Sequence, residues 1–135
     1  MTTPKTILAR ILFVLYIAAV AFLCFMHVDK LPEMQNFIFG IPTDKVAHFL
    51  MFLPFPILAY LAYDHITNKF WSALIFAVLT FVVGSLLAYA TEFIQGKLPY
   101  RSMDITDLRA DMLAMLLSCI FVFIIDVTHL KVRKN

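Results

Sequence analysis

The stretch TEFIQGKLPYRSMDITDLRAD, from Thr91 to Asp111, separates two long apolar runs and gathers a large share of the chain's charge. It holds one glutamate, three aspartates, one lysine and two arginines. Ionisable residues at membrane depth are costly unless they face a bundle interior, water or a partner group. The stretch therefore predicts two helix ends that reach into the membrane edge and are joined by a short polar turn.

The composition of the whole chain is that of an integral membrane protein. Of its 135 residues, 62% are hydrophobic and 15% are charged, and the mean hydropathy is +0.88. Soluble domains have about half apolar and about a quarter charged residues. The length predicts one domain over residues 1–135, and the net charge of +2 gives no support for nucleic acid as a partner. Cys24 and Cys119 lie inside apolar runs, so we expect no disulfide framework.

Four segments are candidates to cross a hydrocarbon core about 30 Å thick, which takes about 20 helical residues. We expect these spans at residues 7–26, 43–63, 70–92 and 104–127. The first could pass for a signal peptide, but its apolar run continues beyond the Ala19–Ala21 cleavage pattern, so we interpret it as a retained helix. The predicted fold class is an all-α membrane protein with a four-transmembrane-helix bundle.

The second span has a predicted start and a predicted bend. Thr43 can cap the helix, and Asp44 complements the positive end of the helix dipole. Pro54 and Pro56 each remove a backbone N–H, so we expect a kink there. The preceding segment, residues 34–41, is too apolar for a free loop in water. We expect it to lie in the membrane interface, with a lid over the bundle as the alternative.

Positive charges predict the orientation of the bundle. Four spans put both termini on one side, and lysine and arginine favour the cytoplasmic side. Basic residues cluster where the first span begins and the last one ends, at Lys5, Arg10, Lys131, Arg133 and Lys134. We therefore expect cytoplasmic termini in a bacterial plasma (inner) membrane. The start of the second span, the end of the third and the start of the fourth then meet at the extracytoplasmic face.

Polar residues mark one edge of each of these three helix ends. Residues three or four apart share a helix face. This spacing joins Lys45 with His48, Asp44 with His48, Glu92 with Gln95, and Asp104 with Asp107 and Asp111. We expect the three edges to form one polar site. The candidate contacts are a hydrogen bond of Asp44 with His48 and ion pairs of Glu92 with Lys45 and of Asp107 with Arg101.

Three motifs in this order resemble the VanZ-like family of small bacterial membrane proteins. The family pattern has K-x-x-H at the start of one span and E-x-x-Q at the end of the next. An arginine follows, and six residues later comes the aspartate that begins D-x-x-x-N-x-x-G. The matching positions are Lys45 and His48, Glu92 and Gln95, and Arg101 and Asp107. The chain departs from the pattern at Asp111, where the family has asparagine, and at Ala114, where it has glycine.

The resemblance implies a small helical membrane bundle of the cell envelope, similar to a protein linked to glycopeptide antibiotic resistance. It implies no established reaction, so whether the chain is an enzyme stays open. Asp111 adds a carboxylate that the family pattern lacks, and Ala114 adds a methyl group where glycine would allow close helix packing. These two positions are where we expect this protein to differ most from the family.

Two classes of function fit the polar residues. In the first, the site binds an anionic lipid-linked envelope precursor or a glycopeptide-related ligand, and Lys45 and Arg101 hold its phosphate or carboxylate. The candidate ligand-binding residues are Lys45, His48, Glu92, Gln95, Arg101, Asp104, Asp107 and Asp111, and the candidate catalytic residues are His48, Glu92 and Asp107. In the second, the protein is a scaffold, and the polar cluster only stabilises the bundle.

Two further classes have less support in the sequence. A small oligomeric transporter would use buried carboxylates, but the charges gather at one face and four spans leave little room for a conduit. A metal could bind His48 and nearby carboxylates, but one histidine is thin support for zinc. We therefore predict no metal and no cofactor. The expected partners are membrane lipids and the envelope precursor.

Overall fold

The computed structural model describes residues 3–27, 36–63 and 69–134. Within them, four helical stretches are long and apolar enough to cross a membrane: Pro4–Phe25, Thr43–Tyr63, Phe70–Gln95 and Ile105–His129. This confirms the prediction of four apolar helices, with ends that differ by up to three residues from those expected. The elements in chain order are α1 (Pro4–Phe25), β1 (Phe37–Ile38), β2 (Ile41–Pro42), α2 (Thr43–Phe52), α3 (Phe55–Tyr63), α4 (Phe70–Gln95) and α5 (Ile105–Lys134).

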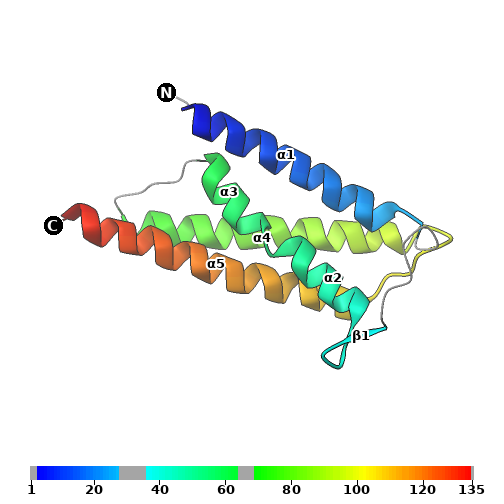
Figure 1. Cartoon of the computed structure of the whole chain (residues 1–135). Helices are drawn as coiled ribbons and strands as arrows, with labels where there is room; N and C mark the ends of the chain where they lie inside the picture. The colour runs from blue at the N-terminus through cyan, green and yellow to red at the C-terminus, as the bar shows by residue number, and fades with distance from the viewer. Residues whose placement is uncertain (1–2, 28–35, 64–68, 135) are drawn as a thin grey trace.

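The helices form a bundle in which α4 and α5 lie side by side along their length (Figure 1). The short helix α2 packs on α5, and α3 packs on α1, so the second span crosses from one helix to the other. The start of α1 and the end of α5 lie at the same end of the bundle (Figure 1). The opposite end therefore holds the start of α2, the end of α4 and the start of α5.

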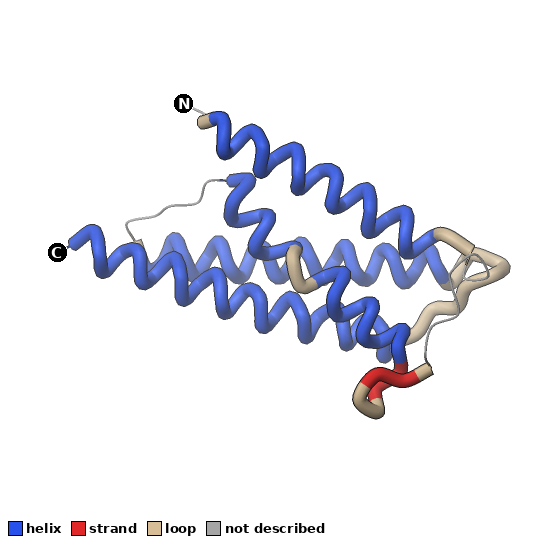
Figure 2. Tube along the Cα trace, in the orientation of Figure 1, coloured by secondary structure: helices blue, strands red, loops and turns tan. Residues whose placement is uncertain are grey.

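The second span is broken at Leu53–Pro54, where the expected kink separates α2 from α3 (Figure 2). Proline cannot donate the backbone hydrogen bond that would continue the helix. The Tyr16 hydroxyl of α1 donates a hydrogen bond to the Met51 carbonyl beside the break. The Met51 carbonyl is thus satisfied inside the bundle, as backbone groups beside a helix break at membrane depth require. The break lets the two halves of the span face different helices.

A two-stranded hairpin precedes α2 and points away from the bundle (Figure 1). Phe37 pairs with Pro42 and Ile38 with Ile41. Phe39 and Gly40 form the turn at φ of 51° and 78°, as a two-residue hairpin with positive φ at both turn positions requires. The Phe39 side chain is fully exposed, so the hairpin is not a lid closed over the bundle. Met34 of the expected interfacial segment lies outside the described residues.

The first turn of α2 differs from the expectation in one respect. Thr43 is already the first helical residue and Pro42 occupies the cap position, with no side-chain hydrogen bond from the cap. The backbone N–H of Thr43 instead donates to the Asn36 carbonyl at 3.2 Å, because the hairpin brings that carbonyl close. The prediction that Thr43 caps the helix was wrong. Asp44 does lie in the first turn, as expected.

The core contains buried residues from all five described helices, and Gly84 of α4 faces α3 and α5 within it. A Cβ atom added at Gly84 would meet the Met115 sulfur and lie 3.0 Å from the Phe55 ring. Ala114, which stands at the glycine position of the family pattern, is fully buried in the same core. The bundle therefore accommodates the extra methyl group of Ala114 and uses Gly84 of α4 for the closest approach.

Candidate functional site

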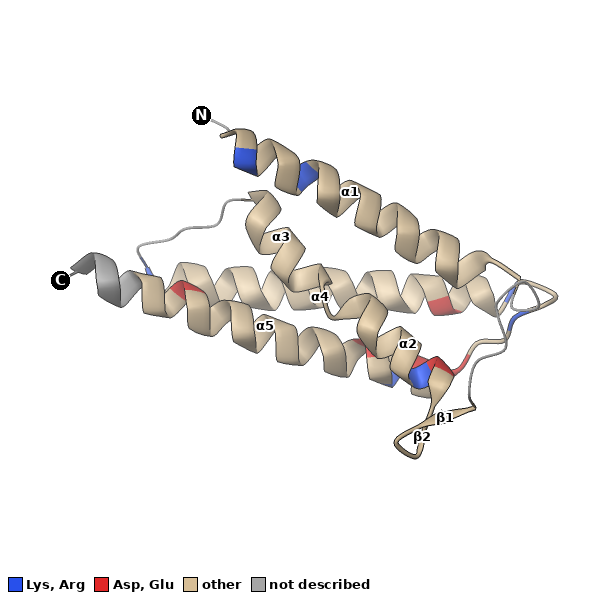
Figure 3. Cartoon of the chain, viewed as in Figure 1, with Lys and Arg blue, Asp and Glu red and all other residues tan. Residues whose placement is uncertain are grey.

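Charged residues from three helix ends meet at the end of the bundle opposite the termini (Figure 3). Lys45 and His48 lie in the first turns of α2, which begins at Thr43. Glu92 lies in the last turn of α4, and Asp107 and Asp111 lie in the first two turns of α5. The expected meeting of three polar helix edges is thus present. We call the side chains of Asp44, Lys45, His48, Glu92, Asp104, Asp107 and Asp111 the acidic cluster.

The outer part of the acidic cluster is organised by Lys45. Its ammonium group lies 2.8 Å from Asp44 Oδ2, 2.7 Å from Asp104 Oδ2 and 2.5 Å from Asp107 Oδ1. One lysine therefore ties the start of α2 to the start of α5. Its three N–H donors each have a carboxylate acceptor, so Lys45 has no donor left for an anionic ligand.

Asp104 also fixes the start of α5. Its Oδ1 accepts hydrogen bonds from the backbone N–H of Thr106 at 2.8 Å and from the Thr106 hydroxyl at 2.6 Å. A side chain that accepts from the first turn caps a helix. The hydrogen bond from Lys45, followed by those from Thr106, holds the pKa of Asp104 well below its usual range. Asp104 is therefore an ionised cap just before α5.

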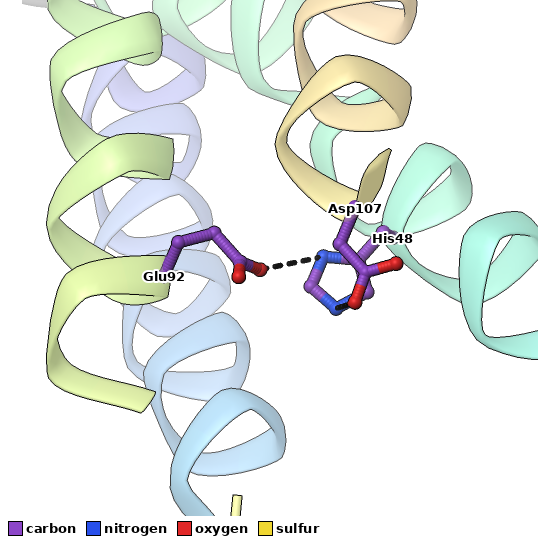
Figure 4. A group of neighbouring side chains, drawn as sticks. All are labelled: His48, Glu92 and Asp107. Atoms are coloured by element: carbon purple, nitrogen blue, oxygen red, sulfur yellow. Dashed lines mark ion pairs between the residues drawn. The ribbon is translucent and has the colours of Figure 1, made fainter. Parts of the chain in front are cut away.

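The inner part of the acidic cluster surrounds His48 (Figure 4). His48 Nδ1 lies 3.1 Å from Asp111 Oδ1 and 3.6 Å from Glu92 Oε1. His48 Nε2 lies 3.6 Å from Asp107 Oδ2. All four side chains are buried, and those of Glu92 and Asp111 are fully so. The imidazole thus has carboxylates on both ring nitrogens.

Asp107 and Glu92 each use their two oxygens differently. Asp107 Oδ1 contacts Lys45, and Asp107 Oδ2 faces His48. Glu92 Oε2 accepts a hydrogen bond from the backbone N–H of Asp104 at 3.0 Å. Glu92 Oε1 is buried, is aimed at His48 and has no hydrogen-bond partner among the described residues. Buried polar atoms in proteins are nearly always paired, so this oxygen has capacity for a further group.

The acidic cluster carries more negative than positive charge. Five carboxylates face one lysine and one histidine among the described residues. Even with His48 protonated, negative charge is in excess if all the carboxylates are ionised. A buried charge without compensation costs several kcal/mol, of the order of the penalty for desolvating an ion. The cluster therefore has to gain protons or a cation.

Two groups of acidic cluster residues have the geometry to hold a cation. One ligand atom each from His48, Glu92 and Asp107 lies within 4.8 Å of the others, and all three residues are buried. Asp44, Asp104 and Asp107 form a second such group. The second group already surrounds the Lys45 ammonium, which is its cation, whereas no lysine or arginine lies between the ligand atoms of the first among the described residues.

Gln95 lies apart from the acidic cluster although the sequence placed it in the same motif as Glu92. Its amide donates to the Cys24 carbonyl at 2.8 Å. Nearby, the Tyr100 hydroxyl donates to the Phe25 carbonyl at 2.9 Å, and the His27 ring stacks on Tyr100 with centroids 3.5 Å apart. Gln95 therefore tethers the end of α1 to α4. The sequence offered no indication of the contributions of Tyr100 and His27.

The expected contacts within the site were wrong in their pairing. Lys45 binds three aspartates in place of Glu92, because Glu92 faces His48 across the bundle. His48 contacts Asp111 in place of Asp44. Arg101 forms no ion pair with Asp107 or with any other described residue, although it lies close enough to act electrostatically on Cys24. Arg101 is therefore a cation at this end of the bundle without a bound carboxylate.

One further buried carboxylate, Asp126, lies far from the acidic cluster, near the other end of α5. Asp126 is almost fully buried and accepts a hydrogen bond from Tyr60 of α3 at 3.5 Å. At that same end, the Arg10 guanidinium of α1 donates to the Ala62 carbonyl at 3.0 Å. Asp126 is therefore a buried carboxylate that pairs with a tyrosine of a neighbouring helix. The acidic cluster, in contrast, gathers three buried carboxylates around His48.

Comparison of the chain with family models, with curated proteins and with solved structures gave no match.

Proposed function

We propose that the chain is a VanZ-like membrane protein of the bacterial envelope that binds an anionic ligand at the extracytoplasmic end of its bundle. The proposal includes cytoplasmic termini, which follow from the basic residues near both termini. Support comes from the K-x-x-H, E-x-x-Q and arginine–aspartate motifs. Lys45, His48, Glu92 and Asp107, which belong to these motifs, meet in one acidic cluster.

The observation that carries the proposal is Arg101, a half-buried cation at this end of the bundle that forms no ion pair with a described residue. Glu92 Oε1, a buried carboxylate oxygen without a hydrogen-bond partner among the described residues, gives separate support for a binding site. A cluster built only to join helices gains stability by pairing each buried polar atom, because an unpaired one costs about 1–3 kcal/mol. A binding site keeps such capacity for its ligand. The unpaired oxygen can accept a hydrogen bond or contact a cation, so the cluster has capacity for a donor group of a ligand, while the anionic group needs a separate cation.

Arg101 is the residue that we assign to the ligand's anionic group. Lys45, the other candidate, is saturated by three aspartates. The Arg101 guanidinium is half-buried and forms no ion pair with a described residue. Arginine binds phosphate and carboxylate groups with two parallel hydrogen bonds. A phosphate of a lipid-linked envelope precursor lies at membrane-surface depth, where Arg101 would meet it.

Binding of a polyprenyl monophosphate by the purified chain in detergent tests this assignment. We expect the phosphate, but not the matching polyprenol, to raise the unfolding midpoint, with about 2.7 kcal/mol of stabilisation at a ligand concentration of 100 Kd. Arg101→Gln should abolish the effect. Arg109→Gln is the matched control, because Arg109 is exposed near the start of α5. Equal stabilisation by the polyprenol, or full binding by Arg101→Gln, would count against the proposal.

A scaffold role is the second candidate, favoured by the contacts of Lys45. This residue joins α2 to Asp104 and Asp107 and so helps to hold the bundle together. His48→Ala and Glu92→Gln separate the two functions. If both variants remain folded and the cellular phenotype of a deletion is no longer complemented, the cluster has a functional role. If both are degraded and the polyprenyl phosphate has no effect, the scaffold role is favoured.

A further inference from the structure

We propose that His48, Glu92 and Asp107 bind a divalent transition-metal ion of the Zn²⁺ type, with Asp111 orienting the imidazole. The proposal deepens the proposed function, because it concerns the same acidic cluster, but it does not require the anionic ligand. It departs from the sequence-based expectation of no metal. The expectation of no metal rested on the single histidine, because the sequence does not reveal how the three helices place the carboxylates.

The three ligand atoms are already close to a binding geometry. They come from α2, α4 and α5, and they lie within 4.8 Å of one another. Atoms bound to zinc at about 2.1 Å in a tetrahedral site lie about 3.4 Å apart, so each pair of ligand atoms has to close by about 1.4 Å at most, shared between two side chains. Side-chain movement of less than an ångström, on the order of thermal fluctuation, therefore brings the three atoms onto one ion.

Glu92 Oε1 independently points to a ligand. It belongs to a fully buried side chain, is aimed at His48 and has no hydrogen-bond partner among the described residues. The nearest basic atom is His48 Nδ1, 3.6 Å away, which is too far for a hydrogen bond. A bound ion supplies the missing partner.

Each of the three ligands is also held from behind by another group. Asp111 contacts His48 Nδ1, the Asp104 backbone N–H donates to Glu92 Oε2, and Lys45 contacts Asp107 Oδ1. Metal sites in proteins have such outer contacts, which fix the tautomer of histidine and the orientation of carboxylates. With Nδ1 protonated toward Asp111, Nε2 presents its lone pair to the ion. A group of acidic side chains that had gathered by chance would not have one supporting contact for each ligand.

The charge of the buried cluster fits a divalent ion. Glu92, Asp107 and Asp111 share one imidazole and one of the Lys45 contacts. A 2+ ion compensates the surplus negative charge that burial makes costly. The imidazole ligand favours Zn²⁺ over Mg²⁺, Ca²⁺ and Mn²⁺, which prefer oxygen ligands.

Calorimetry and elemental analysis of the full chain in detergent, first stripped with a chelator, test the proposal with Zn²⁺ alone. We expect one ion per chain and at least about tenfold weaker binding in Glu92→Gln, which keeps the shape of the side chain but removes a ligand charge. Asp126→Asn is the matched control, because it neutralises a buried carboxylate outside the acidic cluster. It should bind Zn²⁺ as the native chain does. Unchanged affinity in folded Glu92→Gln would overturn the proposal.

The native chain also decides the question if Glu92→Gln does not fold. Folded native protein that takes up less than a tenth of an equivalent of Zn²⁺ overturns the proposal, because the surplus charge is then neutralised by protons. Co²⁺ bound in place of Zn²⁺ should give visible absorption bands that His48→Gln alters. Zn²⁺ binding should persist in Arg101→Gln. If the native chain binds the polyprenyl phosphate but not Zn²⁺, the metal inference alone is overturned. If it binds Zn²⁺ but not the polyprenyl phosphate, only the proposal of an anionic ligand is overturned.

Discussion

His48 Nδ1 of α2 and Asp111 Oδ1 of α5 lie 3.1 Å apart inside the bundle, and the Asp111 side chain is fully buried. The residues are 63 positions apart in the chain. This contact joins the K-x-x-H motif to the position where the chain departs from the VanZ-like pattern. The departure therefore bears directly on the histidine of the acidic cluster.

Two replacements of Asp111 should distinguish what its hydrogen bond contributes to the stability of the fold from what its negative charge contributes. In metal-free buffer we expect Asp111→Asn to be at least as stable as the native chain, because the amide oxygen still accepts from His48 and a surplus buried charge is removed. Asp111→Ala should lose about 1–3 kcal/mol, because it leaves His48 Nδ1 buried without an acceptor. Thermal unfolding in detergent measures both. A strongly destabilised Asp111→Asn would show that the charge itself stabilises the fold.

Asp104 should stabilise the protein in a pH-dependent way. Its lowered pKa means that it binds a proton less readily in the folded state than in the unfolded state. Its contribution is therefore present above the unfolded pKa of about 3.9 and is lost as the pH falls through the folded pKa. We expect Asp104→Asn to lower the unfolding midpoint at pH 6, and the difference from the native chain to shrink below about pH 4.

The same contribution should be partly screened by salt, because the Asp104 side chain is 40% exposed. Thr106→Ala is the control, since it removes the hydroxyl contact of Asp104 and keeps the lysine contact. A midpoint difference between the native chain and Asp104→Asn that does not change with pH would contradict the prediction.

Gly84→Ala should loosen the packing of α4 on α5. The new Cβ would meet the Met115 sulfur and the Phe55 ring, and overpacking of a core costs about 1–3 kcal/mol. Met115→Ala makes room for the added methyl group, so the double variant should be more stable than the sum of the two single changes predicts. Leu86→Ala, at an exposed position of α4, is the control. Strictly additive effects on the unfolding midpoint would show that the three side chains are not in contact.

Phe39 at the hairpin turn should lie in the membrane interface. Its ring is fully exposed and no part of the described chain covers it. Trp71 is the only tryptophan of the sequence, so Trp71→Phe combined with Phe39→Trp gives one reporter at the turn. We expect blue-shifted emission and quenching by brominated lipids in vesicles, since aromatic rings favour the interface. Fluorescence at the wavelength of a water-exposed tryptophan, without quenching by brominated lipids, would contradict this prediction.

The sequence predicted the helices well because hydropathy is a local property. A run of about 20 apolar residues needs no partner to identify it as a candidate span, and all four runs are helical. Pro54 likewise broke its helix where expected, since a proline removes the hydrogen bond at its own position. The start of α2 was predicted correctly, but its cap was not, because the hairpin supplies a carbonyl to Thr43 that no local pattern reveals.

Sequence by itself determined that three polar edges lie at the same end of the bundle, because helical spacing and the alternating direction of successive spans suffice for that. It did not determine which side chains touch. The rotation and depth of each helix follow from packing, here from Gly84 against Phe55 and Met115 and from the break that turns α2 onto α5. Only the tertiary structure therefore paired His48 with Asp111 and left an oxygen of Glu92 open.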